Sequence, residues 1–119
     1  EDALKVTCEK TNCLIKDYTV GPVFMKDKDC GGHEWIIEFN RKPNNLNYFT
    51  EILDNSLKSI NSDYEAKRYN NMTLALPKIH VARKDLFYDW LKSKNKLGGQ
   101  HKVPRLSNSR NFVNELLAL

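Results

Sequence analysis

The chain has 119 residues, of which 40% are apolar and 29% charged, and this length suits one globular domain better than two. No apolar run approaches the roughly 20 residues that a membrane span requires, and the steady supply of Leu, Ile, Val and aromatic residues excludes a disordered chain. The net charge is +4, but its placement is uneven, because residues 92–110 carry six basic side chains and no acidic one.

The start of the chain and its three cysteines add to the evidence from composition. The polar pair Glu1 and Asp2 is not the start of a signal peptide, and without an initiator methionine we expect the chain to be a piece of a longer protein. Cys8, Cys13 and Cys30 form no CxxC pair, so we expect neither a disulfide framework nor a zinc site. Small buried or half-buried cysteines are typical of a reducing, cytoplasmic compartment.

The N-terminal part of the chain predicts a helix followed by a strand. Residues 3–12 form a short amphipathic helix with Asp2 available as its N-cap. Residues 13–25 place their bulky side chains on one parity, which indicates a strand. Gly21-Pro22 within it implies a bulge or an edge position, since proline cannot donate a hydrogen bond to a neighbouring strand.

The clearest strand runs from Glu34 to Phe39, after a polar turn over residues 26–32. Trp35, Ile37 and Phe39 share one parity, so we expect them to face a core. Glu34, Ile36 and Glu38 form the opposite row. We expect that second sheet face to be partly wet or to meet another domain.

The longest predicted element is a helix that Asn44 or Asn45 caps and that runs to about Tyr69. Its apolar stripe recurs at three- and four-residue steps and consists of Leu46, Phe49, Leu53, Leu57, Ile60 and Tyr64. A third strand follows over residues 77–83, where His80 falls on the outward parity as an ordinary surface histidine.

Two helices close the chain. Asp85 can cap the first, which stops at Gly98-Gly99, and after a basic loop the second covers residues 108–119. The order is therefore α-β-β-α-β-α-α. It predicts an α+β fold in which helices pack on a small mixed sheet of about three strands.

The sequence lacks the signatures of a complete enzyme. No histidine stands at a catalytic spacing from a cysteine, and no zinc-protease, nucleophile-elbow, Walker or dinucleotide-binding motif occurs. The chemically suggestive segment is 97–106, where two glycines reduce side-chain bulk. Lys102 is a compact cation suited to phosphate or carboxylate oxygens, and Pro104 fixes the chain before Arg105. The plainer alternative is a basic loop that only caps a helix.

Four stretches, residues 61–69, 77–81, 87–91 and 99–105, occur in a recognisable order. The most specific is Gln100-His-Lys-Val-Pro-Arg105, a glutamine–x–lysine–x–proline–arginine signature, to which Asn61, Tyr64 and Arg68 add. Together they resemble the C-terminal domain of the auxin-responsive "Gretchen Hagen" family of acyl-acid amido synthetases, over nearly the whole chain.

The resemblance implies the chemistry of the adenylate-forming superfamily, to which acyl-CoA synthetases also belong. Its members use ATP and Mg²⁺ to activate a carboxylic acid as an acyl-adenylate, from which an amino-acid amine then displaces AMP. Residues 1–119 would be a single mobile C-terminal domain that closes over an N-terminal domain. That larger domain would hold most of the ATP, Mg²⁺ and acyl-acid contacts, so we expect the isolated chain to be inactive.

The resemblance also implies a role for each matching residue. Lys102 would be the catalytic lysine that is brought to the phosphates and the substrate carboxylate, a role that a positioned cation in a closing cleft can fill. Gln100 and Arg105 would bind nucleotide, with Arg105 alternatively orienting the loop. Asn61, Tyr64 and Arg68 would be structural or hinge residues, and no metal ligand is expected.

Two other functions stay open from the sequence. The first is a stand-alone binding module whose basic C-terminal segment holds nucleic acid, although the base-stacking motif of an RNA-recognition sheet is missing. The second is a small-ligand regulatory domain of ferredoxin-like type with a pocket between helices and sheet. Steeply salt-dependent binding to DNA or RNA would distinguish the first from a ligase domain.

Overall fold

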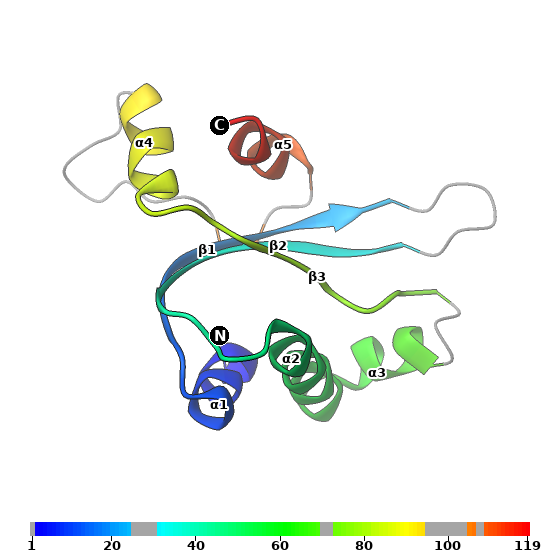
Figure 1. Cartoon of the computed structure of the whole chain (residues 1–119). Helices are drawn as coiled ribbons and strands as arrows, with labels where there is room; N and C mark the ends of the chain where they lie inside the picture. Colours follow the sequence, from blue (N-terminus) through cyan, green and yellow to red (C-terminus); the bar gives the residue numbers. More distant parts are fainter. Residues whose placement is uncertain (1, 25–30, 70–72, 95–104, 107–108) are drawn as a thin grey trace.

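A computed structural model describes residues 2–24, 31–69, 73–94, 105–106 and 109–119 (Figure 1). Over these ranges the chain forms five helices and a three-stranded sheet. In chain order they are α1 (Asp2–Thr11), β1 (Leu14–Val23), β2 (Gly32–Arg41), α2 (Leu46–Ile60), α3 (Ser62–Arg68), β3 (Lys78–Val81), α4 (Leu86–Ser93) and α5 (Asn111–Leu117). The predicted α+β fold is confirmed.

The sheet lies between two layers of helices. Its strand order is β1-β2-β3, with β1 antiparallel and β3 parallel to β2. Helices α1, α2 and α3 lie on one side of the sheet, and α4 and α5 lie on the other (Figure 1). The first side buries Trp35 and Ile37 of β2 against Phe49 and Leu53 of α2, as the strand pattern predicts.

The expectation that the other sheet face is partly wet is wrong. Ile36 is 1% exposed and packs with Phe87 and Trp90 of α4 and Val113 of α5 in a second core. The alternation of Glu34, Ile36 and Glu38 suggested a wet surface because two of the three side chains are charged. Both carboxylates are instead buried beneath the second helical layer and paired there.

Glu34 shows how a carboxylate is tolerated in this position. Its Oε2 lies 2.6 Å from Nε2 of His80, and its Oε1 lies 2.8 Å from Nη1 of Arg110. Burial by itself raises the pKa of Glu34, but the hydrogen bonds from His80 and Arg110 outweigh burial and hold the pKa below its ordinary value. His80 is therefore a half-buried partner of Glu34 on the adjacent strand, and not the ordinary surface histidine that its parity indicated.

The single long helix predicted from residue 45 to about Tyr69 is two helices. Asn45 caps the first as expected, and its side chain accepts a hydrogen bond from the N–H of Tyr48. The break falls at Asn61, whose backbone is extended (φ −128°, ψ 106°). Its N–H ends α2 on the carbonyl of Leu57 at 2.9 Å, and its side chain caps α3 by accepting from the N–H of Tyr64 at 3.1 Å.

The predictions for Gly21-Pro22 and for Asp85 are each confirmed only in part. Gly21-Pro22 lies on β1, an edge strand as predicted, but the irregular register falls near the start of β1, between Leu14 and Asp17. Asp85 occupies the N-cap position of α4 as predicted, yet its side chain makes no capping hydrogen bond. It has φ 65° and pairs with Lys16 of β1 at 3.2 Å instead.

Gly21 allows α5 to lie directly on β1. A Cβ added at Gly21 would overlap Cγ2 of Val113 and lie 3.3 Å from its Cβ, in the second core. We expect Gly21→Ala to destabilise the fold by about 1–3 kcal/mol, because a packed core cannot absorb the extra methyl group. Urea unfolding measures this change. Gly32→Ala on β2 is the matched control, since its Cβ would meet only Ala75 at 3.9 Å; equal losses for both variants would contradict the packing argument.

Within the described ranges, no helix combines the length and apolar character that crossing a bilayer demands.

Candidate functional site at the edge of β1

The motif that the sequence singles out, Gln100 to Arg105, is described only at its end. Gln100 and Lys102 lie outside the described residues, so their placement is not part of the site's geometry. Arg105 and Leu106 are described and lie along the outer edge of β1, the strand that has β2 on its other side.

The backbone holds this short segment to β1. The N–H of Val20 donates to the carbonyl of Arg105 at 2.9 Å, and Val20 and Leu106 form an isolated parallel bridge. An edge strand has unpaired backbone groups that can hold an added segment in this way. The end of the motif is therefore positioned by the sheet itself.

The Arg105 side chain adds a second anchor. Its Nη1 pairs with Oδ1 of Asp17 and donates to the carbonyl of Tyr18 at 3.1 Å. The guanidinium carbon also lies 4.6 Å from the centre of the Tyr18 ring, within range of a cation–π interaction. The guanidinium is thus engaged by β1, where sequence analysis expected it to contact nucleotide or to orient the loop.

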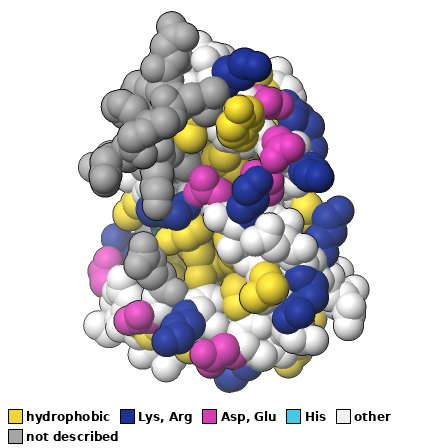
Figure 2. All heavy atoms as spheres, turned by 90° about the vertical axis from the view of Figure 1, so that its left-hand side faces the viewer, with side chains coloured by type: hydrophobic (Ala, Val, Ile, Leu, Met, Phe, Trp, Pro, Cys, Tyr) yellow, Lys and Arg dark blue, Asp and Glu magenta, His cyan; other side chains and the backbone are white. Residues whose placement is uncertain are grey.

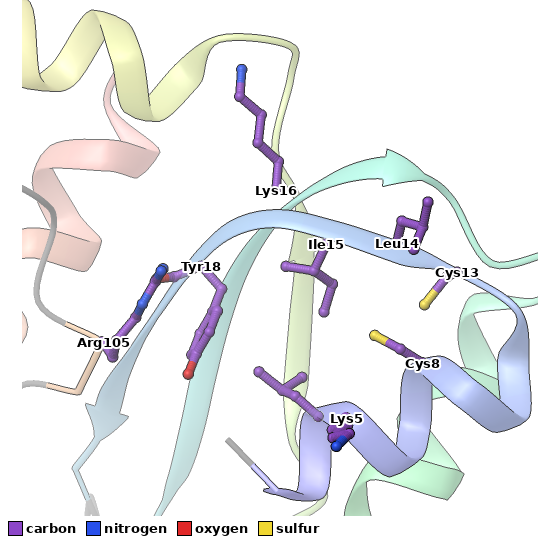
Figure 3. A pocket seen from close by; sticks show the side chains of 9 residues that line it. Lys5, Cys8, Cys13, Leu14, Ile15, Lys16, Tyr18 and Arg105 are labelled. Atoms are coloured by element: carbon purple, nitrogen blue, oxygen red, sulfur yellow. The ribbon is translucent and has the colours of Figure 1, made fainter.

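Two pockets adjoin Arg105 and Tyr18. One has a volume of about 300 Å³ and lies between α1 and the start of β1, where Lys5 and Lys16 accompany a mainly apolar lining (Figure 3). The other, of about 370 Å³, lies between the sheet and helices α2 and α3 and reaches Trp35. Figure 2 views the side of the molecule that is on the left in Figure 1 and shows apolar side chains in a hollow, with charged side chains around it.

Asn61, Tyr64 and Arg68 meet at the joint between α2 and α3. Tyr64 and Arg68 both bind Asp54, which is 3% exposed and was not predicted from the sequence. Asp54 accepts hydrogen bonds from the Tyr64 hydroxyl at 2.6 Å and from Nε and Nη2 of Arg68 at 2.7 and 2.8 Å. Nη1 of Arg68 also donates to the carbonyl of Leu74 at 3.1 Å, which links the joint to the chain that leads into β3.

The titration of this cluster follows from its hydrogen bonds. Burial alone raises the pKa of Asp54, but the bonds from Arg68 and Tyr64 outweigh it, so the net pKa lies below the ordinary value. Burial and the bond to Asp54 both raise the pKa of Tyr64, so its hydroxyl stays a donor. Asp54 and Arg68 thus form a buried ion pair, and the neutral Tyr64 hydroxyl donates to the Asp54 carboxylate. An acidic residue beside the apolar stripe of a predicted helix was the signal that could have located it.

The basic segment from residue 92 to 110 is partly neutralised within the fold. Arg105 pairs with Asp17, Arg110 pairs with Glu34 at 2.8 Å, and Lys94 pairs with Glu115 at 2.7 Å. Lys92 is exposed on α4, whereas Lys96 and Lys102 lie outside the described residues. These intramolecular pairs reduce the positive charge that the segment presents to a polyanion, and they weigh against the nucleic-acid alternative.

Across the ranges that the structure covers, no three His, Cys, Asp or Glu side chains come together as a set of ligands. Mg²⁺ commonly keeps several waters and binds through one or two carboxylates together with substrate phosphates, so it does not require three protein ligands. No step of the chemistry is assigned to Mg²⁺ at these residues.

Comparison with known proteins identifies the fold. A family model described as the GH3 family C-terminal domain matches residues 1–111. Two solved structures, AtGH3.15 acyl acid amido synthetase in complex with 2,4-DB and GH3.15 acyl acid amido synthetase, superpose with TM-scores of 0.74 and 0.72 at 18% identity. In both cases 98% of this chain is covered but only 22% of the other. A search of curated protein sequences found no match. The resemblance carried by residues 61–105 is thereby confirmed, and the chain belongs to the GH3 family as a C-terminal domain.

Proposed function

We propose that this chain is the mobile C-terminal domain of an ATP-dependent ligase that joins an acyl acid to an amino acid. It would close over an N-terminal adenylating domain and support first acyl-adenylate formation and then amide conjugation. The observation that carries the proposal is the attachment of Arg105, the last residue of the motif, to the outer edge of β1. Membership of the GH3 family and the fold shared with an acyl acid amido synthetase support it.

In this proposal Lys102 is the catalytic residue. It precedes Arg105 by three residues, so chain length alone keeps its Cα within roughly 11 Å of the anchor. When the acid attacks the α-phosphate of ATP, negative charge grows on the phosphoryl oxygens, and a positioned ammonium stabilises that charge. Domain closure would bring the lysine to the phosphates and exclude water from them. The described residues alone supply no such cleft, so we expect the isolated chain to have no turnover.

Gln100 is proposed to contact the nucleotide. Arg105 was expected either to bind nucleotide or to orient the loop, and its pairing with Asp17 and Tyr18 supports the orienting role.

Asn61, Tyr64 and Arg68 are proposed to be structural residues. Asn61 ends one helix and begins the next, while Tyr64 and Arg68 tie the second helix to Asp54 on the first. ATP and Mg²⁺ are proposed to be held mainly by the N-terminal domain. The unlinked thiols of Cys8 and Cys13 support a cytoplasmic location.

The orienting role of Arg105 is tested in the longer protein by a double-mutant cycle with Asp17. We expect Arg105→Ala and Asp17→Ala each to lower acid-dependent pyrophosphate release by about 10-fold, and the double variant to lose little more, because both changes break one contact. If Arg105 binds nucleotide instead, Arg105→Ala raises the KM for ATP while Asp17→Ala does not. Normal pyrophosphate release in all three variants would show that the contact between Arg105 and Asp17 has no role in the reaction.

A further inference from the structure

Two cysteines that are separated by four residues in the sequence are neighbours in the fold. Cys8 lies in the second half of α1 and Cys13 immediately precedes β1. Between them Asn12 turns the chain with a left-handed backbone (φ 54°), and the N–H of Cys13 donates to the carbonyl of Cys8 at 3.2 Å. This turn brings the two side chains to the same wall of the pocket between α1 and β1.

The two sulfur atoms point toward one another at that wall (Figure 3). The Thr11 hydroxyl donates to Sγ of Cys13 at 3.3 Å. Both cysteines are unlinked. The geometry therefore places two reduced thiols face to face, whereas the sequence predicted small buried or half-buried cysteines and no disulfide framework.

The two thiols differ in access. Cys8 is half-buried, Cys13 is 2% exposed, and both line the pocket of about 300 Å³. A molecule as small as a peroxide can reach Cys8 through this pocket, whereas another protein's thiol cannot reach Cys13. We propose that Cys8 and Cys13 are a redox pair that closes to an intramolecular disulfide when a peroxide oxidises Cys8.

The reaction balances with the peroxide as the only oxidant. The Cys8 thiolate attacks one oxygen of hydrogen peroxide, the O–O bond breaks, and Cys8 becomes a sulfenic acid as hydroxide leaves. The Cys13 thiolate then attacks the Cys8 sulfur, the S–O bond breaks, and a second hydroxide leaves. With the two thiol protons, the hydroxides become two molecules of water. The thiols lose two electrons and the peroxide gains them.

The surroundings of Cys8 make this a slow reaction at neutral pH. Burial, followed by the hydrogen bond with Cys13, raises the pKa of Cys8 to about 12, so the thiol is almost fully protonated at pH 7. The charged and titratable side chains that line the same pocket are Lys5, Lys16, Tyr18 and Arg105, with no carboxylate among its lining residues. Because the thiolate is the nucleophile, we expect the oxidation rate to rise about 10-fold per pH unit from pH 7 to 9.

Peptide mapping of the folded chain tests the proposal directly. The reduced chain is treated with excess hydrogen peroxide at pH 9, remaining thiols are blocked, and the protein is digested with trypsin. Cleavage after Lys5, Lys10 and Lys16 places Cys8 in residues 6–10 and Cys13 in residues 11–16. A disulfide between them joins two separate peptides, which dithiothreitol releases, and the intact chain is lighter by two hydrogen atoms.

Two cysteine variants test which residues form the disulfide. Cys30→Ser removes the third cysteine, which lies outside the described residues, and should leave the joined peptide unchanged. Cys13→Ser should abolish it and leave Cys8 as a sulfenic acid that dimedone traps. The proposal is overturned if Cys30 is the partner of either cysteine, if Cys8 proceeds to sulfinic acid while Cys13 stays reduced, or if both thiols survive conditions that oxidise free cysteine. The map of the unsubstituted chain decides these points even if the Cys13 variant does not fold.

Discussion

Replacing Lys102 by alanine in the longer protein should lower the rate of acyl-adenylate formation by roughly 10²-fold or more. That factor corresponds to a few kcal/mol of transition-state stabilisation, the amount that one positioned cation supplies to a developing oxyanion in a closed site. The measurement is acid-dependent pyrophosphate release in the first half-reaction, with substrate at saturation. Because the cation would act on the transition state, we expect kcat to fall more than the KM for ATP rises.

Lys92→Ala is the matched control for that experiment. Lys92 is exposed on α4 and belongs to the same basic stretch, so its removal changes the net charge equally. We expect pyrophosphate release to stay close to normal in this variant. A comparable loss at Lys92 would show that bulk charge matters more than the motif, and near-normal release by Lys102→Ala would exclude the lysine from the chemistry.

The sheet and its first core were predictable because one face of each strand obeys a simple period. Trp35, Ile37 and Phe39 are large apolar residues at every second position, and this local pattern needs no knowledge of the rest of the chain. The burial of the opposite row, Glu34, Ile36 and Glu38, could not be predicted from a local period. Glu34 is buried only because His80 and Arg110, 46 and 76 residues further along the chain, are there to pair with it.

The break at Asn61 was missed because two local signals conflict. The apolar stripe continues without interruption through Leu57, Ile60 and Tyr64, and this period predicted one helix. Asn61, however, is a strong N-cap residue and is followed by Asp63 and Glu65, acidic residues that favour the first turn of a new helix. The capping signal prevailed because both ends at the joint are satisfied by Asn61 itself.

The candidate site was located from the sequence only through the motif that ends at Arg105. The geometry that anchors it depends on Asp17, 88 residues earlier, and no spacing rule connects the two. The contact between Asp54 and Arg68 could not be predicted either. The two residues are only 14 positions apart, but the turn at Asn61 decides whether their helices meet. Residue types and motifs thus identified candidate residues, while their partners required the fold.

Removing the Asp54 carboxylate should cost about 3–5 kcal/mol of folding free energy, the largest stability effect that we expect in the described part of the chain. Arg68 is 8% exposed and would lose the carboxylate to which its Nε and Nη2 donate, and the Tyr64 hydroxyl would lose its acceptor. Urea unfolding of Asp54→Ala at pH 7 measures the loss. Asp63→Ala is the control, since Asp63 and Lys67 form an exposed i,i+4 pair at 3.1 Å, and its removal should cost no more than about 0.5 kcal/mol.

The pH dependence of unfolding, compared between the native chain and Asp54→Ala, is a second and independent test. The folded state lowers the pKa of Asp54 from its ordinary 3.8, chiefly because the bonds from Arg68 and Tyr64 outweigh burial. The carboxylate therefore contributes its stability in full above the unfolded pKa and loses it as the pH falls through the lower, folded pKa. We expect the stability difference between the native chain and Asp54→Ala to be constant from pH 7 to 5 and to shrink below about pH 4. A difference that persists unchanged at pH 2 would mean that lost packing, and not the ionised carboxylate, explains the effect.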